Sequence, residues 1–320
     1  MTASAGRVIS IDGPVISTGD LSRQRDLFES VIGMQCLAEH VLDRDTCRAL
    51  FACSADRATL LQLTTPTSNI GVWLVCFEPL SSVTIREGGV GVGCNALKMI
   101  DFFTSDRLAA VDRLRKHGFE LVSEGASIDL PDGSKFREAH AKGPDGVMIA
   151  AIEPLNVEAR DFVTLADRVF SEVQSSSGPV SDFEPVKIFY EQILGISMGL
   201  HYEFASESFS RMVGVEQTLT IRANNYGRVI EDVMLGIIHY GLPAGTYEDL
   251  RERARPPHRG IVGVRLTVSG LDRIVTRCLE AGLEIPCTPI SLRLDESGTL
   301  RAAVVRAPHG VWHWLIERQG

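Results

Sequence analysis

The sequence predicts an α+β protein in which one βαβββ module occurs four times, arranged as a tandem duplication. Residues 20–33 and residues 182–195 each run from an aspartate through an amphipathic stretch to a glycine, over the same spacing. A gap of 28 residues separates Gly118 from Gly146, and the second half repeats it between Gly282 and Gly310. The matching features are offset by 162 to 164 residues throughout. A fixed period of this kind indicates an internal repeat.

Each module is expected to begin with a β-rich run, followed by a helix and three further strands. In the fourth module Leu271, Ile274 and Val275 recur at the spacing of a helix that buries one face. Asp106 stands where a carboxylate caps a helix start, and Gly118 where a left-handed residue ends it. The same roles are expected for Asp20, Asp182 and Gly282, and the initial β-rich runs are residues 8–17, 97–103, 169–174 and 261–268.

Two local patterns carry a resemblance to a known family. Residues 182–195 contain Phe189-Tyr190 shortly before Leu194-Gly195, with a weaker copy at residues 20–33. Residues 143–154 begin with Gly-Pro-Asp-Gly and continue as an apolar strand, with a counterpart at residues 307–318. This order resembles the vicinal oxygen chelate superfamily of glyoxalases, bleomycin-resistance proteins and extradiol dioxygenases, over nearly the whole chain.

The resemblance implies that two modules pair into an incompletely closed β cup with flanking helices, one cup from each half. The first domain is expected at residues 1–157, with modules at 7–88 and 94–154. The second is expected at residues 166–320, with modules at 168–243 and 258–318. The stretch between the halves would be the linker.

Composition limits the partners of the chain. It has 320 residues, a formal net charge of −9 and 44% hydrophobic residues, typical of a globular protein. Nucleic acid is not an expected partner, because phosphate binding needs a basic face. No apolar run suits a membrane span, and no signal peptide is apparent. The seven cysteines lack Cys-x-x-Cys spacing and indicate reduced thiols in a cytoplasmic protein. We expect a small-molecule ligand, and the sequence leaves a homodimer open.

Metal ligands are missing from the positions at which the resemblance places them. In the superfamily's metalloenzymes a His or Gln from a first strand and a Glu from a last strand bind a divalent ion. The residues at the positions that can be aligned here are Gly13, Met99, Ala150, Ser175, Gly263 and Trp314. We therefore predict no metal and no other cofactor. A register slip of one or two residues would instead recruit Asp12, Asp101, Glu172 or Gln174.

Three residues are the candidates for acid–base catalysis without a metal. His201 and Glu203 alternate along a strand, so they share a face and could pair in the cup of the second half. The alternative is an exposed polar face of the sheet. His239 ends a buried strand and would face either the cup or the core. His140, next to the Gly-Pro-Asp-Gly turn, is expected at the surface.

Further residues are candidates for ligand binding. Trp312 and Trp314 alternate on the last strand and would offer an aromatic surface to a flat ligand, or would plug a disused cup. His313 should then point away. The remaining candidates are Glu39, His40, Tyr240 and Asp101, the last of which would face the cup or pair with an arginine.

Three functions follow from these candidates. The first is a metal-independent lyase, isomerase or hydratase acting on a small aromatic or oxygenated substrate in the cup of the second half. The second is a metal-free ligand-binding protein of the bleomycin-resistance type. The third is a dioxygenase or glyoxalase with atypical metal ligands.

Overall fold

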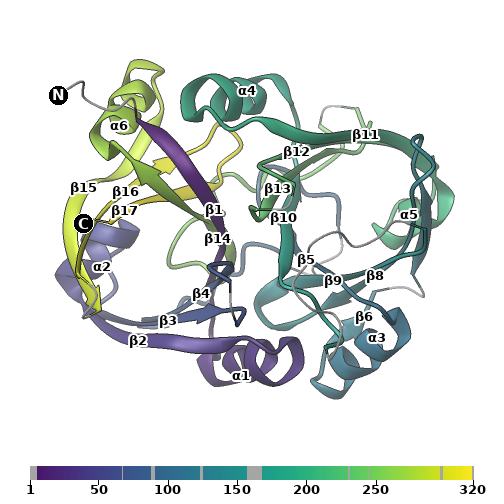
Figure 1. The fold of residues 1–320 in the computed structure, drawn as a ribbon, viewed down its shortest axis with the longest axis horizontal. Coiled ribbons are helices and arrows are strands. Elements are labelled where there is room, and N and C mark those ends of the chain that lie inside the picture. Colours follow the sequence, from purple (N-terminus) through teal and green to yellow (C-terminus); the bar gives the residue numbers. More distant parts are fainter. Residues whose placement is uncertain are drawn as a thin grey trace.

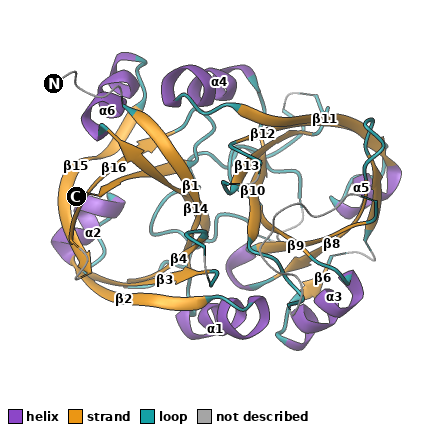
Figure 2. Ribbon diagram, viewed as in Figure 1, coloured by secondary structure: helices purple, strands orange, loops and turns teal. Residues whose placement is uncertain are grey.

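The computed structural model describes residues 6–66, 68–87, 91–122, 125–156, 168–229, 231–243, 245–295 and 298–318. The α+β fold expected from the sequence is confirmed: two strongly curled sheets lie side by side, with helices around them (Figures 1 and 2). No helix in these ranges is long and apolar enough to cross a membrane.

One sheet is built from the first and fourth modules, and we call it the outer-module cup. Within the described chain it has eight strands. In spatial order they are β15 (Glu284–Asp295), β16 (Gly298–Arg306), β17 (Trp312–Arg318), β14 (Gly260–Ser269), β1 (Arg7–Ser17), β4 (Gly71–Glu78), β3 (Arg57–Thr64) and β2 (Gln35–Asp43).

The other sheet is built from the second and third modules, and we call it the inner-module cup. It has nine strands in the described ranges. They are β11 (Met198–Ser206), β12 (Leu219–Tyr226), β13 (Met234–His239), β10 (Val173–Pro179), β5 (Met99–Phe103), β9 (Met148–Pro154), β8 (Lys135–Lys142) and β6 (Glu120–Leu121), with β7 (Ala126–Asp129) paired to β8.

The composition of the two cups corrects the expectation that each half of the chain forms its own. The first strands of the paired modules meet antiparallel in the middle of each sheet: β1 pairs with β14, and β10 with β5. The two cups therefore cross the boundary between the sequence halves. Strand pairing depends on which edges meet in space, and the local pattern of a module does not encode this choice.

Helices follow the first strand of each module as predicted, and they lie outside the curled sheets (Figure 1). They are α1 (Leu21–Asp26) with η1 (Leu27–Ile32), α3 (Arg107–Lys116), α4 (Glu184–Lys187) with η3 (Ile188–Leu194), and α6 (Leu271–Glu280). The carboxylates of Asp20 and Asp106 cap α1 and α3 as expected. Asp182 departs slightly: Phe183 is the N-cap residue of α4, and Asp182 accepts from the Glu184 N–H.

Two short helices were not predicted, and each packs at the open side of a cup, where it contacts edge strands of the sheet. They are α2 (Arg44–Phe51) in the outer-module cup and α5 (Glu207–Met212) in the inner-module cup (Figure 1). Each follows the second strand of its module. Phe51 and Leu50 of α2 belong to the apolar core of one cup, and Phe209 and Met212 of α5 to that of the other. The concave face of each sheet is therefore packed against a helix of its own.

Candidate functional site

The outer-module cup is filled by aromatic side chains. Trp314 is fully buried against Phe51, and its indole N–H donates to the Leu50 carbonyl at 2.9 Å. Trp312 lies beside it, with ring centroids 6.0 Å apart. A side chain at Gly263 would meet the Trp314 ring and the Trp312 carbonyl, so this glycine makes room for the tryptophans.

This packing decides between the two interpretations of the tryptophans. Trp312 and Trp314 are part of a buried core and plug the cup around the helix α2. His313 points to the other side, as predicted, and lies 3.1 Å from the Tyr190 hydroxyl. The end of β17 therefore contributes core packing, and an open stacking surface for a flat ligand is not formed there.

The inner-module cup has a polar concave face instead. The backbone register places His140, Ala150, Asp101 and Ser175 in one lateral row across β8, β9, β5 and β10. Ile149 and Ile100, which alternate with Ala150 and Asp101, belong to the core on the opposite, convex side. Successive side chains on a strand point to opposite faces, so Asp101 and Ala150 point into the cup.

Asp101 is the central member of this row. It is 6% exposed, one carboxylate oxygen accepts a short hydrogen bond from the Ser175 hydroxyl, and Oδ1 has no partner among the described residues. Burial, together with the nearby Glu138 carboxylate, raises the pKa of Asp101 to about 7, while the hydroxyls of Ser175 and Ser177 act in the opposite direction. A carboxyl group with a pKa near neutrality can both accept and return a proton.

His140 and Glu138 form a second polar pair in the same cup. His140 is fully buried, and its Nε2 lies 2.5 Å from the Glu138 Oε1. If Nε2 donates to Glu138, Nδ1 carries the free lone pair, and Nδ1 has no partner among the described residues. The Phe209 ring of α5 lies edge-on to the imidazole at 6.2 Å. The arrangement is a buried imidazole oriented by a carboxylate.

Lys98 and two tyrosines complete the polar lining. Lys98 is 1% exposed, and its ammonium group lies 5.8 Å from the centre of the Tyr240 ring. Burial, together with the charge of the neighbouring Arg86, lowers the pKa of Lys98 to about 7. Tyr240 is buried, and its hydroxyl has no partner in the described structure. Tyr202 points into the same cup and is hydrogen-bonded to Asn225, and burial raises the pKa of both phenols.

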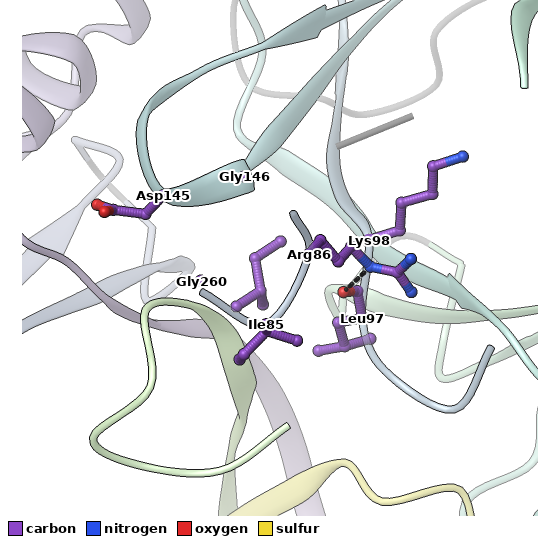
Figure 3. A pocket seen from close by; sticks show the side chains of 8 residues that line it. Ile85, Arg86, Leu97, Lys98, Asp145, Gly146 and Gly260 are labelled. Carbon is purple, nitrogen blue, oxygen red and sulfur yellow. Dashed lines mark hydrogen bonds between the residues drawn. The ribbon is translucent and has the colours of Figure 1, made fainter. Parts of the chain in front are cut away.

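A narrow crevice beside Arg86 and Lys98 is a different feature and holds no chemistry of its own. It lies where the Gly146 turn meets Gly260, and it is too tight to admit water. Arg86 bends to donate from Nε to the Leu97 carbonyl at 2.9 Å, while Lys98 extends away from the crevice (Figure 3). Arg86 also donates to the carbonyls of Gly93 and Ala96, so it holds the segment that connects β4 to β5 in place.

Comparison with solved structures identifies the fold. Glyoxalase I from Zea mays superimposes with a TM-score of 0.61 at 17% identity, covering 98% of this chain and 92% of that one. A putative dioxygenase from Bacillus subtilis superimposes with a TM-score of 0.59 at 12% identity, covering 98% and 86%. The chain has the vicinal oxygen chelate fold. At the level of sequence, no family model and no curated protein matches it.

The residues at the metal-ligand positions that the family resemblance implies are not suited to bind a metal. In the inner-module cup they are Met99, Ala150 and Ser175, and none supplies an imidazole or carboxylate. In the outer-module cup they are two glycines, Gly13 and Gly263, and the buried Trp314. No group of three or more His, Cys, Asp or Glu side chains in the described chain could hold a metal ion.

The residues suggested by a register slip do not assemble a site either. Asp12 accepts hydrogen bonds from the hydroxyls of Ser10 and Thr267, and Asp101 from that of Ser175. Gln174 donates to the Ser171 hydroxyl and to the Glu172 carbonyl.

The structure places the predicted pair His201 and Glu203 outside the cup, which corrects that expectation. Both side chains are exposed, with His201 bonded to Asn224 at 2.7 Å and Glu203 facing Arg222. Tyr202, between them, points inward instead, because alternation along β11 gives the cup only one of two neighbours.

The other predicted residues divide between the two faces. His239 is half-buried beside Phe183 and accepts a hydrogen bond from the Gly241 N–H, away from the cup. Glu39 is exposed beside Arg25, and His40 lies 3.3 Å from Gln62 in the outer-module sheet. Only Asp101 and Tyr240 of the predicted set lie in the inner-module cup.

Sequence reasoning missed Glu138, His140 and Lys98. His140 was expected at the surface, and it is fully buried. The alternation of Glu138 and His140 along residues 135–142 was the available signal, since it gives both residues the same face of one strand.

Proposed function

We propose that the chain is an enzyme that transfers protons on a small oxygenated substrate in the inner-module cup. The observation that carries this proposal is the row formed by Asp101, Ala150 and His140. The two polar side chains flank an alanine, two strands apart, at a Cα separation of roughly 10 Å. We place the ligand over Ala150, because a small side chain there separates the two acid–base groups without blocking either.

Asp101 is assigned the role of base. Its carboxylate removes a proton from the carbon next to a substrate carbonyl, and the electron pair moves to the carbonyl oxygen. The Tyr240 hydroxyl is a donor suited to that oxygen. With a β,γ-unsaturated carbonyl substrate, the protonated Asp101 then returns the proton to the γ-carbon of the dienolate. The carbonyl re-forms, and the carbon–carbon double bond moves into conjugation with it. The pKa of Asp101, raised to about 7 by burial, suits both steps.

His140 is assigned a second proton-transfer role at the other side of Ala150. The carboxylate of Glu138 fixes the orientation of the ring, and Nδ1 is left for the substrate. The apolar part of the cup, formed by Phe204, Phe209 and Ile221, would exclude water and accept the hydrocarbon part of the substrate.

We propose a reaction without a metal, because the residues described above at the expected metal-ligand positions of this cup supply no imidazole or carboxylate. The supporting comparisons are the glyoxalase I and dioxygenase structures, which share the fold of this chain. A metal-free binding protein is the competing function, and turnover separates the two: a binder saturates and leaves its ligand unchanged.

The test is a substrate screen in deuterated water. Aldehydes, ketones, hydroxy acids and phenols are incubated with the protein, and conversion or deuterium incorporation is followed by mass spectrometry. We expect turnover by the wild type and its loss in Asp101→Asn. Asp112→Asn is the matched control, since Asp112 is an exposed residue paired with Lys116 on α3. Equal turnover by wild type and Asp101→Asn would refute the proposal.

A further inference from the structure

The outer-module cup holds an arginine, Arg265, that forms no ion pair with a carboxylate of the described residues. Arg265 alternates on β14 with Val264 and Leu266, which belong to the core on the convex side, so its side chain lies on the concave face. Its guanidinium carbon lies 4.9 Å from the centre of the Trp73 ring.

The hydrogen bonds of this guanidinium are incomplete. Nη2 donates to the backbone carbonyl of Asp12 over 3.4 Å, and Nε is buried without a partner among the described residues. The Asp12 carboxylate is nearby, but it accepts from Ser10 at 2.6 Å and from Thr267 at 2.7 Å. Arg265 is half-buried and forms no ion pair within 4 Å with a carboxylate of the described chain, although Asp12 is close enough to favour its charged form.

Two indole N–H groups in the same cup also lack acceptors. Trp73 is 3% exposed and Trp312 is 4% exposed, and neither Nε1 has a hydrogen-bond partner in the described structure. Trp73, Val15, Gly263 and Trp312 form one row across β4, β1, β14 and β17, so both indoles lie on the concave face.

These atoms share one property: each is a donor. An indole N–H and a guanidinium can donate but cannot accept. A buried donor without an acceptor costs free energy. A ligand that supplies only acceptors would satisfy these donors, and a negative charge on it would be attracted to the guanidinium of Arg265.

We propose that the outer-module cup binds a small organic carboxylate, held by Arg265 and the indole N–H groups of Trp73 and Trp312. The planar fork of an arginine matches a carboxylate through two parallel hydrogen bonds. The ring of Trp73, which lies beside the guanidinium, would pack against the hydrocarbon part, and Trp312 would contribute only its N–H. Arg318, at the exposed end of β17, adds positive charge on the same side and lies close enough to act on Arg265.

The charge of Arg265 persists under physiological conditions. Burial lowers the pKa of its guanidinium to about 10, with Arg318 acting in the same direction and Asp12 opposing it. This site lies in a different sheet from Asp101 and His140, so it goes beyond the proposed catalytic function.

Tryptophan fluorescence reports on this site alone. The chain contains three tryptophans, and all three lie in the outer-module cup. The probes are benzoate and benzamide, which have nearly the same shape and differ in charge, with acetate as a smaller carboxylate. Ionic strength is held constant with sodium chloride. The variants are Arg265→Gln, Arg265→Lys and, as matched control, Arg211→Gln on the exposed surface of α5.

We expect a saturable change of emission with benzoate and at least tenfold weaker binding of benzamide. Arg265→Gln should weaken benzoate binding at least tenfold, Arg265→Lys should retain part of it, and Arg211→Gln should match the wild type. Asp101→Asn should also bind normally, which separates this proposal from the catalytic one. An unchanged emission with both carboxylates, or equal binding of benzoate and benzamide, would overturn it. Circular dichroism shows whether Arg265→Gln is folded, and Arg265→Lys serves as the test if it is not.

Discussion

The imidazole of His140 and the carboxylate of Glu138 lie 2.5 Å apart on one strand, two residues from each other and facing the same cup. A buried imidazole held by a carboxylate keeps one ring nitrogen as donor and leaves the other for chemistry. We predict that His140→Gln lowers kcat by about 10²- to 10⁴-fold on the substrate found in the screen. His201→Gln, on the exposed face of β11, is the control and should retain full activity. A similar loss in both variants would contradict the assignment of the site.

The rate should depend on the ionisation of Asp101. A base acts as the carboxylate, and burial raises the pKa of Asp101 to about 7, so log kcat should rise with pH up to about that value and then level off. Steady-state rates between pH 5 and pH 9 provide the measurement. A flat profile across this range would remove Asp101 from the role of base.

The free energy of unfolding of the protein should also depend on pH through the ionisation of Asp101. The folded-state pKa is raised from the usual 3.8 to about 7, so the protonated form is favoured in the folded protein. The contribution of this group to the free energy of unfolding is therefore present below pH 4 and is lost as the pH rises through 7. Such a shift in pKa corresponds to a loss on the order of 4 kcal/mol in the free energy of unfolding.

Asp101→Asn isolates this effect, because the amide cannot ionise. Relative to the wild type, the variant should gain stability between pH 4 and pH 7, measured by urea unfolding at several pH values. Asp112→Asn should show no such trend. If the difference between wild type and Asp101→Asn stays constant with pH, the raised pKa is excluded.

Metal content tests the interpretation of the ligand positions. Because Met99, Ala150 and Ser175 are poor ligands, we expect less than about one-tenth equivalent of iron, manganese, zinc or nickel in protein purified without chelator. Elemental analysis before and after incubation with each ion provides the measurement. A full equivalent of one ion would return the metalloenzyme reactions to consideration.

Trp314 should be a major contributor to the stability of the outer-module cup. It is fully buried against Phe51, and its N–H is bonded to the Leu50 carbonyl. Trp314→Ala should lower the free energy of unfolding by about 3 to 5 kcal/mol, and Trp314→Phe by less, since the ring then still fills part of the space. Urea unfolding measures both. A neutral Trp314→Ala would mean that the cup is not packed as described.

The sequence contained the repeat, the module type and the helix ends. Asp20 and Asp106 cap their helices and Gly118 adopts a left-handed conformation as predicted, because these features depend on residues close in the chain. The absence of ligands at Gly13, Ala150 and Trp314 was equally visible, since it depends only on residue type.

The composition of the candidate site was not determined by sequence alone. Alternation along a strand shows which residues share a face, but it does not show which face turns inward. This choice placed Tyr202 in the cup and His201 outside it, and it buried His140, which looked like a turn residue.

Only the tertiary structure decided which modules pair. The first strand of each module can meet any equivalent strand, and the choice of β1 with β14 and β5 with β10 involves residues far apart in the chain. That choice brought Asp101 of the second module next to Ser175 of the third, and Trp73 of the first into one row with Trp312 of the fourth. Local sequence determined the parts of this protein, and long-range strand pairing determined which side chains share a cup.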